Sequence, residues 1–221
     1  MNMAGEWKIA PVTFAAPLQA GDMLRAAAQE AIQTGVDLTA RHFCDDALEA
    51  LEGETLDISG CIFERCRFGE LDLKRLSFVD CVFDKCEWSN VRLTGVACQR
   101  VQFRNCRMTG LELLRGMLMN TVFESCMLDY ASFSETRLDR VMFENCRMRE
   151  SLWGDVKLGK TRFSNADLTR TQWIRTPLAG MDMSHSLIGG WNISLFDLRG
   201  VKVTAAQVIE LSGLLGVEII E

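Results

Sequence analysis

The feature that most constrains the fold of this chain is a repeat of five residues. From Ile58 onward an apolar residue stands at every fifth position, and a second, usually smaller, residue stands two places before it, as in Cys61–Phe63 and Cys66–Phe68. The central positions run from 58 to 203 in steps of five without an insertion. A period of five matches neither the 3.6 residues of a helix nor the 2.0 residues of a strand. It indicates a solenoid, in which equivalent residues of successive turns stack.

A second period, of twenty residues, lies over the first. Phenylalanine recurs at Phe63, Phe83, Phe103, Phe123, Phe143 and Phe163, and cysteine recurs at Cys66, Cys86, Cys106, Cys126 and Cys146. One turn of the solenoid therefore holds four pentapeptides and has four sides. Because neighbouring strands lie about 4.8 Å apart, the repeats would form a rod about 36 Å long. Phenylalanine stacked on phenylalanine predicts an aromatic ladder that fixes the register.

Residues 58–203 resemble the pentapeptide-repeat proteins. The pattern of that family is a small residue, any residue and then Leu or Phe at the centre, and the stretches NADLTRTQW (165–173) and YASFSETRL (130–138) are typical of it. The resemblance implies an all-β solenoid, a right-handed quadrilateral β-helix. This chain often has Cys, Val or Leu in the small position, where Ala is usual, which predicts a wider or more tightly filled interior.

The N-terminal residues 1–57 are expected to cap the rod, because a solenoid exposes unpaired backbone at its ends. A helix is predicted over residues 22–34, with Asp22 as N-cap and Gly35 after its last turn. Residues 36–57 are expected to form an imperfect first turn, since Leu38, Phe43 and Leu48 keep the phase of the repeat. Residues 1–20 would form an arm laid over the rod through three apolar residues, Trp7, Ile9 and Phe14.

The C-terminal residues 204–221 predict a helix capped by Thr204 and a short strand over 217–220. The segment DLRGVKVTAAQVIELSGLLGVEII (197–220) is similar to the ends of quinolone-resistance (Qnr-type) pentapeptide-repeat proteins, in which the last helix pairs two rods. The resemblance implies a two-fold homodimer through Val208, Ile209, Leu211, Leu214 and Leu215. The alternative is that these side chains only close the open end of one rod.

The nine cysteines are expected to be free thiols that fill the interior. Eight of them fall on inward positions, and only Cys44 lies outside this pattern. The C-x4-C spacing of Cys61 and Cys66 places both thiols on adjacent walls, where a free cysteine packs as a small hydrophobe. Metal binding or thiol chemistry is the alternative. The two histidines, His42 and His185, belong to no nucleophile, metal or phosphate-binding motif, so neither enzymatic activity nor a metal or cofactor is expected.

The composition limits the class of protein and the kinds of partner that this chain can have. A hydrophobic share of 48% and the absence of proline between Pro17 and Pro177 predict a packed core. A pI near 5.1 argues against direct binding of nucleic acid. No apolar run approaches the length of a membrane span, and the first residues lack the pattern of a secretory signal. A cytoplasmic protein with reduced thiols is therefore expected.

We predict a protein-contact face on the outer surface of the wall that carries the phenylalanine ladder. Its acidic column consists of Glu64, Asp84, Glu124 and Glu144, with Arg104 as the one basic member, and an apolar stripe beside it consists of Ile62, Val82, Val122 and Met142. An apolar stripe next to charges is typical of protein-contact surfaces. The alternative is an ordinary solvated sheet face, on which charges of either sign stabilise stacked rows.

Two hypotheses about function follow. Qnr-type proteins bind type II topoisomerases as mimics of duplex DNA, so the resemblance implies DNA gyrase or topoisomerase IV as partner and an effect on quinolone sensitivity. The expected length is close to one DNA turn, about 34–36 Å. However, the repeats at 58–203 hold 21 basic and 17 acidic residues, and the acidic surplus lies mostly in residues 1–57, with the rest in residues 204–221. The alternative is a structural or adaptor module that binds another protein through an exposed face of the β-helix.

Overall fold

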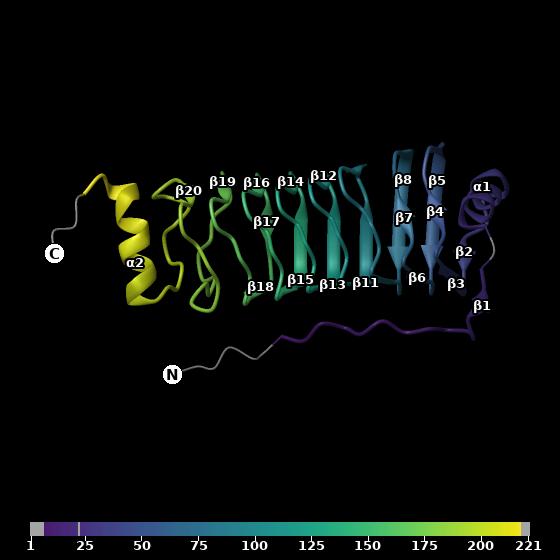
Figure 1. The fold of residues 1–221 in the computed structure, drawn as a ribbon, viewed down its shortest axis with the longest axis horizontal. Helices are drawn as coiled ribbons and strands as arrows, with labels where there is room; N and C mark the ends of the chain where they lie inside the picture. The colour runs from purple at the N-terminus through teal and green to yellow at the C-terminus, as the bar shows by residue number, and fades with distance from the viewer. Residues whose placement is uncertain (1–6, 22, 218–221) are drawn as a thin grey trace.

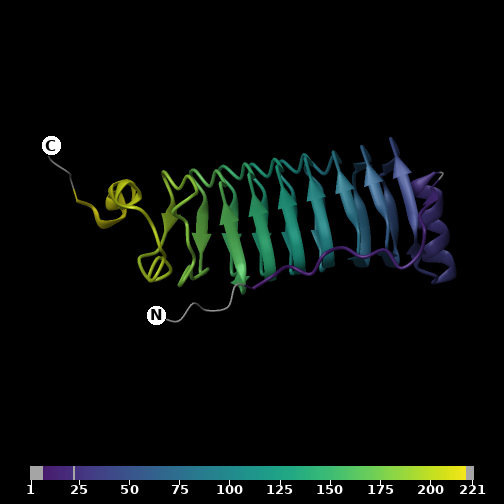
Figure 2. The ribbon, with the colours of Figure 1, turned by 90° about the horizontal axis from the view of Figure 1, so that it is seen from below.

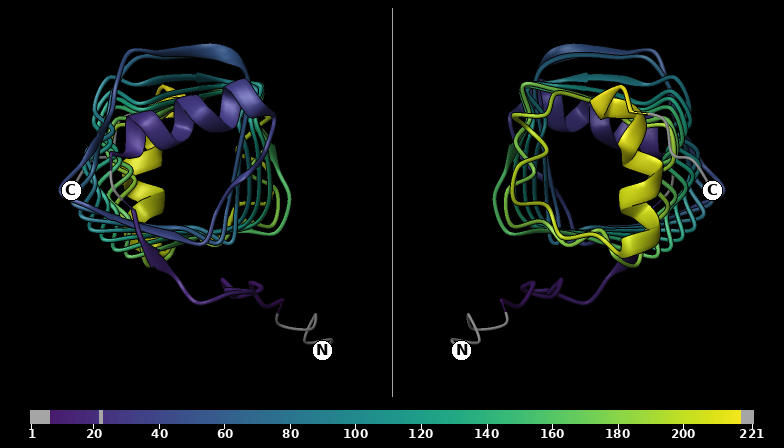
Figure 3. Two further views of the ribbon diagram at one scale, coloured as in Figure 1. Left: turned by 90° about the vertical axis from the view of Figure 1, so that its right-hand side faces the viewer. Right: turned by 90° about the vertical axis from the view of Figure 1, so that its left-hand side faces the viewer.

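The computed structural model describes residues 7–21 and 23–217. The chain forms a β-solenoid of about nine turns with a helix at each end (Figure 1). Viewed along the rod, the turns stack as four-sided coils (Figure 3). The four-sided solenoid that the sequence predicts is confirmed. At about 4.8 Å per turn, nine turns make a rod about 43 Å long.

The strands of the described residues form three sheets. The largest contains β1 (Gln19–Ala20), β2 (Leu38–Thr39), β3 (Arg41–Cys44), β5 (Leu51–Ser59), β6 (Ile62–Glu64), β8 (Leu71–Val79), β9 (Val82–Asp84), β11 (Ala97–Arg104), β13 (Met117–Glu124), β15 (Arg137–Glu144), β17 (Lys157–Leu158) and β18 (Thr161–Ser164). The second contains β10 (Arg92–Thr94), β12 (Glu112–Leu114), β14 (Ser132–Ser134), β16 (Leu152–Gly154), β19 (Gln172–Ile174) and β20 (Asn192–Ile193). The third pairs β4 (Ala47–Leu48) with β7 (Arg67–Phe68).

Strands of successive turns pair in parallel with a shift of twenty residues, as Phe83 with Phe103 and Phe103 with Phe123. This shift confirms four pentapeptides per turn. The turn before Ile58 pairs in the same register, since Leu38 lies beside Ile58 and Phe43 beside Phe63. The stacked pairing therefore begins twenty residues before the unbroken repeat of the sequence.

The corners depend on a left-handed backbone conformation at every fifth residue. The residue two places after the central one has a positive φ at most corners, for example Asn105 (φ 54°) and Asn145 (φ 53°). Residues 55, 70, 75, 160, 185 and 195 are exceptions. Without the corner at residue 55 or 75, β5 and β8 each continue for nine residues, and this part of the first turns bows outward in the end view (Figure 3).

Aromatic ladders fill the interior. The ring centroids of consecutive phenylalanines lie 4.7 Å apart for Phe63–Phe83 and 4.8 Å apart for Phe103–Phe123, with the rings nearly parallel. The predicted ladder is confirmed, and it extends back to Phe43. Trp153 and Trp173 stack in the same way, with centroids 5.1 Å apart. Stacked rings of this kind bury large apolar surfaces and resist a slip of the register.

The cysteines pack as the sequence predicts. Eight are buried, and Cys44 is exposed. The thiol of Cys106 donates to the carbonyl oxygens of Phe83 and Arg104 at 3.4 and 3.3 Å. Burial raises the pKa of Cys98 to about 12, which keeps this thiol protonated and unreactive.

Both ends are closed by helices. Helix α1 (Leu24–Thr34) buries Leu24, Ala28 and Ala31. Asp22, the predicted N-cap, lies outside the described residues; Asp46 of the first turn accepts the Leu24 N–H at 2.6 Å. At the other end, Thr204 caps α2 (Ala205–Leu211) through a capping box with Gln207, and a 3₁₀ helix, η1 (Ser212–Leu215), follows.

The strand predicted over 217–220 lies, apart from Val217, outside the described residues. In the part of the chain that the structure describes, neither helix has the length and apolar character needed to cross a bilayer.

Candidate functional site

The outer surface of one side of the rod collects the residues that the sequence singled out. We call this side the phenylalanine wall; its central residues are Phe43, Phe63, Phe83, Phe103, Phe123, Phe143 and Phe163, carried by β3, β6, β9, β18 and the ends of β11, β13 and β15. The residue after each centre faces outward, so Glu64 lies beside Asp84, and Glu124 beside Glu144, in adjacent strands. The predicted column therefore exists as a row of stacked neighbours.

The column is mixed in charge. Arg104 separates Asp84 from Glu124 in the row, and its Nε lies 3.8 Å from the Glu124 carboxylate. Arg65 pairs with Glu64, and Asn105 donates to the Asp84 carboxylate at 3.1 Å. These neighbours offset much of the negative charge. The column does not present the unbroken line of negative charge that a strand of DNA carries.

The apolar stripe of the same wall is partly covered. Val82 is only 9% exposed, and Ile62, Val122 and Met142 are half-buried. The N-terminal arm, residues 7–21, runs back along this wall from the first turn of the rod (Figures 1 and 2).

The arm contacts the rod at widely separated turns. Its strand β1 pairs with β3, and the Thr13 N–H and hydroxyl donate to Asp80 at 3.0 and 3.1 Å. Further along, the Ala10 N–H donates to the Asn120 side-chain oxygen at 3.1 Å. The Arg162 guanidinium lies 5.2 Å from the ring centroid of Trp7, within the range of a cation–π contact.

The sequence anticipated the arm but not its anchors on the rod. Of the three apolar arm residues that it singled out, Trp7 and Ile9 are half-buried, whereas Phe14 is 42% exposed. The sequence offered only a weak indication of the anchors. Asn120 interrupts a column of corner residues in which its neighbours, one turn before and one turn after, are Arg100 and Arg140.

The five residues predicted to form the dimer contact fall into two groups that differ in burial. Leu211 is buried and Leu214 packs against the core, so these two close the end of the rod. Val208, Ile209 and Leu215 are 55–61% exposed. Phe196, in the last turn, is 70% exposed. The end therefore has both a closing layer and an exposed apolar layer.

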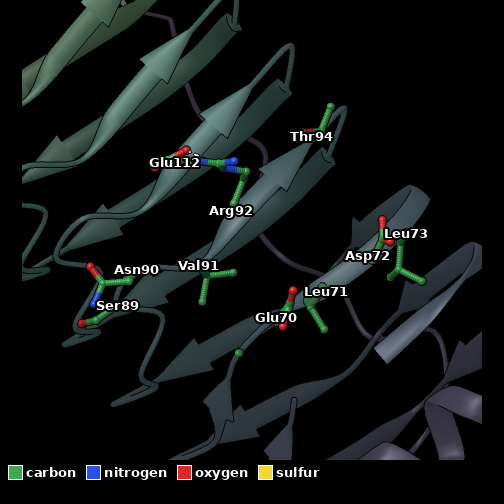
Figure 4. Close-up of a pocket in the computed structure, with 11 residues that line it drawn as sticks. Glu70, Leu71, Asp72, Leu73, Ser89, Asn90, Val91, Arg92, Thr94 and Glu112 are labelled. Carbon is green, nitrogen blue, oxygen red and sulfur yellow. Dashed lines mark hydrogen bonds and ion pairs between the residues drawn. The ribbon is translucent and has the colours of Figure 1, made fainter. Parts of the chain in front are cut away.

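The hollows of the surface are shallow and open. One hollow of about 560 Å³ lies between the first residues of the bowed strand β8 and the start of β10, the first strand of the second sheet (Figure 4). Leu71, Leu73 and Val91 line it, and Arg92 donates to Glu112 across it at 2.6 Å. Two of its four charged groups, Arg92 and Glu112, already form an ion pair, and its lining supplies no histidine or cysteine. Among the described residues no cluster of His, Cys, Asp or Glu is placed to hold a metal ion.

Comparison with known proteins fits this geometry. A model of the pentapeptide repeat region matches residues 96–173, and a model of pentapeptide repeats in eight copies matches residues 72–110. The chain is a pentapeptide-repeat protein. No curated protein matches it.

Solved structures of the same architecture are distant. A trypsin-treated variant of QnrB1, a plasmid-mediated fluoroquinolone resistance protein, is 20% identical, with 83% of this chain and 90% of that chain covered and a TM-score of 0.39. HetL, a pentapeptide-repeat protein involved in heterocyst differentiation regulation in the cyanobacterium Nostoc, is 11% identical, with 79% and 92% covered and a TM-score of 0.33. Likeness at this level carries no inference about function.

Proposed function

We propose that this protein is a non-enzymatic, cytoplasmic rod that binds another protein through the phenylalanine wall. The observation that carries the proposal is the surface of that wall, where a half-buried apolar stripe runs beside a row of charges. Apolar contacts supply buried area, and a row of fixed charges supplies register and specificity. The interior ladders hold both rows on a stiff frame, which limits the entropy lost on binding.

A type II topoisomerase, DNA gyrase or topoisomerase IV, is the partner to test first. The support is the resemblance of residues 197–220 to the ends of Qnr-type proteins, together with a rod whose length of about 43 Å exceeds one DNA turn of about 34–36 Å. In this form of the proposal the acidic column of Glu64, Asp84, Glu124 and Glu144 takes the place of phosphates. Arg104 and the other ion-pair partners would have to turn away from the contact.

The test is supercoiling by purified gyrase, with and without a quinolone, as the protein is titrated to micromolar concentration. We expect inhibition or protection from the drug, and loss of either effect in the double variant Asp84→Lys, Glu124→Lys. The matched control is Glu112→Lys, a charge reversal on β12, which should behave as the unaltered protein. If neither supercoiling nor drug sensitivity responds, the topoisomerase form of the proposal is wrong.

A structural or adaptor role with a different protein partner is the second candidate. The mixed charge of the column favours it, because alternating signs suit a protein surface better than a DNA-binding groove. A photo-crosslinking residue at position 122 would capture the partner in cells, with position 132 of β14 as control. Capture of a topoisomerase would decide for the first candidate, and specific capture of another protein would decide for the second.

We also propose that two rods pair through the C-terminal end. Val208, Ile209 and Leu215 support this, because they remain exposed while Leu211 and Leu214 pack onto the rod. Sedimentation should show a dimer that Ile209→Lys converts to a monomer. Val36→Lys, an exposed position beyond α1, is the matched control and should leave the dimer intact. A monomer at all concentrations would contradict the pairing.

A further inference from the structure

We propose that the seat of the arm on the phenylalanine wall is a docking track for an extended, proline-containing segment of a partner protein, and that the chain's own residues 7–18 occupy this track in cis. The inference deepens the proposed function by naming the kind of segment that the wall binds. It rests on the proposed function only for the existence of a partner, since the track itself can be tested without one.

The spacing of the anchors matches an extended chain. Asp80 and Asn120 occupy equivalent corners two turns apart, which is a distance of about 9.6 Å along the rod. The N–H groups that they accept belong to Thr13 and Ala10. These donors are three positions apart in the sequence, and an extended chain covers about 10 Å over three positions. Trp7 lies three residues further on, and its partner Arg162 lies two turns beyond position 122. The track thus accepts one contact for every three residues of an extended segment.

The acceptors are fixed by the rod itself. Arg100 donates from Nε and Nη2 to the two carboxylate oxygens of Asp80 at 2.7 and 2.6 Å. Arg140 donates from Nε to the Asn120 side-chain oxygen at 2.9 Å, the atom that also accepts from Ala10. These contacts do not involve the arm, so both acceptors keep their orientation when the arm leaves. Preorganised acceptors favour the binding of a new segment.

The track also has an apolar floor. Val82, Val122 and Met142 lie in one row of neighbouring strands with Gln102 between the first two. Trp7, Ile9 and Val12 are the half-buried apolar residues of the arm's outer part. A segment that binds here therefore needs apolar or aromatic side chains interrupted by backbone N–H donors at intervals of three residues.

The arm is held by few contacts, which suits an occupant that can be displaced. Three hydrogen bonds, all from Ala10 and Thr13, join residues 7–18 to the rod among the described residues. Pro11 and Pro17 have no N–H to donate. Residues 13–17 are all exposed. Compared with a strand inside the solenoid, this segment has little to lose when another segment takes its place.

The experiment is a peptide titration. A fluorescein-labelled peptide of residues 7–18 is added to a chain that begins at Gln19 and to the full chain, and fluorescence anisotropy is measured. We expect saturable binding to the shortened chain. Binding to the full chain should be at least about tenfold weaker, because the tethered arm competes at a high effective concentration. A peptide with Ala10→Pro and Thr13→Pro lacks both donors and should not bind.

Variants of the rod give the matched pair. Asn120→Gly removes the acceptor while suiting the left-handed corner, and it should abolish peptide binding. Asn145→Gly makes the same change at a corner outside the track and should leave binding unchanged. The full chain with Ala10→Pro and Thr13→Pro frees the track without shortening the protein, and it should bind the unaltered peptide.

The proposal is overturned if the shortened chain, shown to be folded by circular dichroism, fails to bind the peptide, or if the full chain with the two prolines fails to do so. It is also overturned if a dimer of the full chain disappears on shortening, because the occupant would then be a second copy's arm. Failure of the gyrase and crosslinking experiments would leave the peptide result unaffected, so the two proposals can fail separately.

Discussion

The phenylalanine wall and the side opposite it are built alike inside and differ outside. We call the opposite side the tryptophan wall; it consists of β10, β12, β14, β16, β19 and β20 and has Trp153 and Trp173 at its centre. Both walls bury stacked rings about 5 Å apart. Outside, the first carries the arm, whereas the second begins beside the bowed strand β8 and carries mainly polar residues. The repeat thus determines the wall, and the outward residues determine what binds to it.

The largest effect should come from breaking the ladders. Phe123→Ala and Trp153→Ala each remove a fully buried ring, and each should lower the free energy of unfolding by about 3–5 kcal/mol. Urea denaturation measures both. If the two walls are equivalent inside, the two losses agree to within about 1 kcal/mol. A loss of stability in only one of the two variants would show that the two walls contribute unequally to the core.

Much of this interior could be predicted from the sequence. The five- and twenty-residue periods predict which residues point inward and which stack, because the central position of every pentapeptide from 58 to 203 is apolar. The bowed strands could not be predicted. Arginine occupies a left-handed corner at Arg100 but no such corner at Arg75, so residue type alone does not place the corners. The anchors of the arm were also hidden, since contacts between Ala10 and Asn120 follow no period.

A smaller difference in stability is expected between a glycine-to-alanine change in the bowed region and the same change in the tryptophan wall. A Cβ at Gly53 would lie 2.8 Å from Ile32 Cγ2 of α1, whereas a Cβ at Gly154 meets nothing closer than 3.7 Å. Gly53→Ala should therefore lower the free energy of unfolding by about 1–3 kcal/mol through overpacking. Gly154→Ala, the matched change, should alter it by less than about 0.5 kcal/mol. Thermal melts of both variants test this, and equal melting temperatures would refute the distinction.

The pH dependence of the arm contact should be smaller still. The Arg100 guanidinium holds the pKa of Asp80 below its usual value of 3.8. A lowered pKa in the folded state stabilises the protein fully above the ordinary pKa, and this contribution is lost as the pH falls through the folded-state pKa. Below about pH 3.8 the contact of Thr13 with Asp80 should weaken, which proteolysis of the arm by pepsin would report.

Asp155 is the comparison for this titration. Arg175 lowers its pKa in the same way, but the pair lies on the exposed corner after the tryptophan wall. Asp155→Gly should leave the cleavage of the arm unchanged, whereas Asp80→Gly, which removes the acceptor of the Thr13 N–H and suits the left-handed corner, should speed it already at neutral pH. Equal cleavage of the two variants would show that Asp80 does not hold the arm.

The smallest expected effect concerns the thiols. Cys44 is exposed and the other eight cysteines are buried, so a thiol reagent should modify about one cysteine in the native protein and all of them after denaturation. Modification of Cys44 should leave the stability of both walls unchanged. Rapid reaction of several native thiols would contradict the packed interior.

Hydroxyl-radical footprinting of the two walls, in the full chain and in the chain that begins at Gln19, tests the central claim most directly. If the arm covers the phenylalanine wall, oxidation of Val82, Val122 and Met142 rises severalfold when the arm is removed. Over the same comparison Leu152, on the outer surface of β16, stays unchanged. Equal oxidation of Val82, Val122 and Met142 with and without the arm would contradict the account.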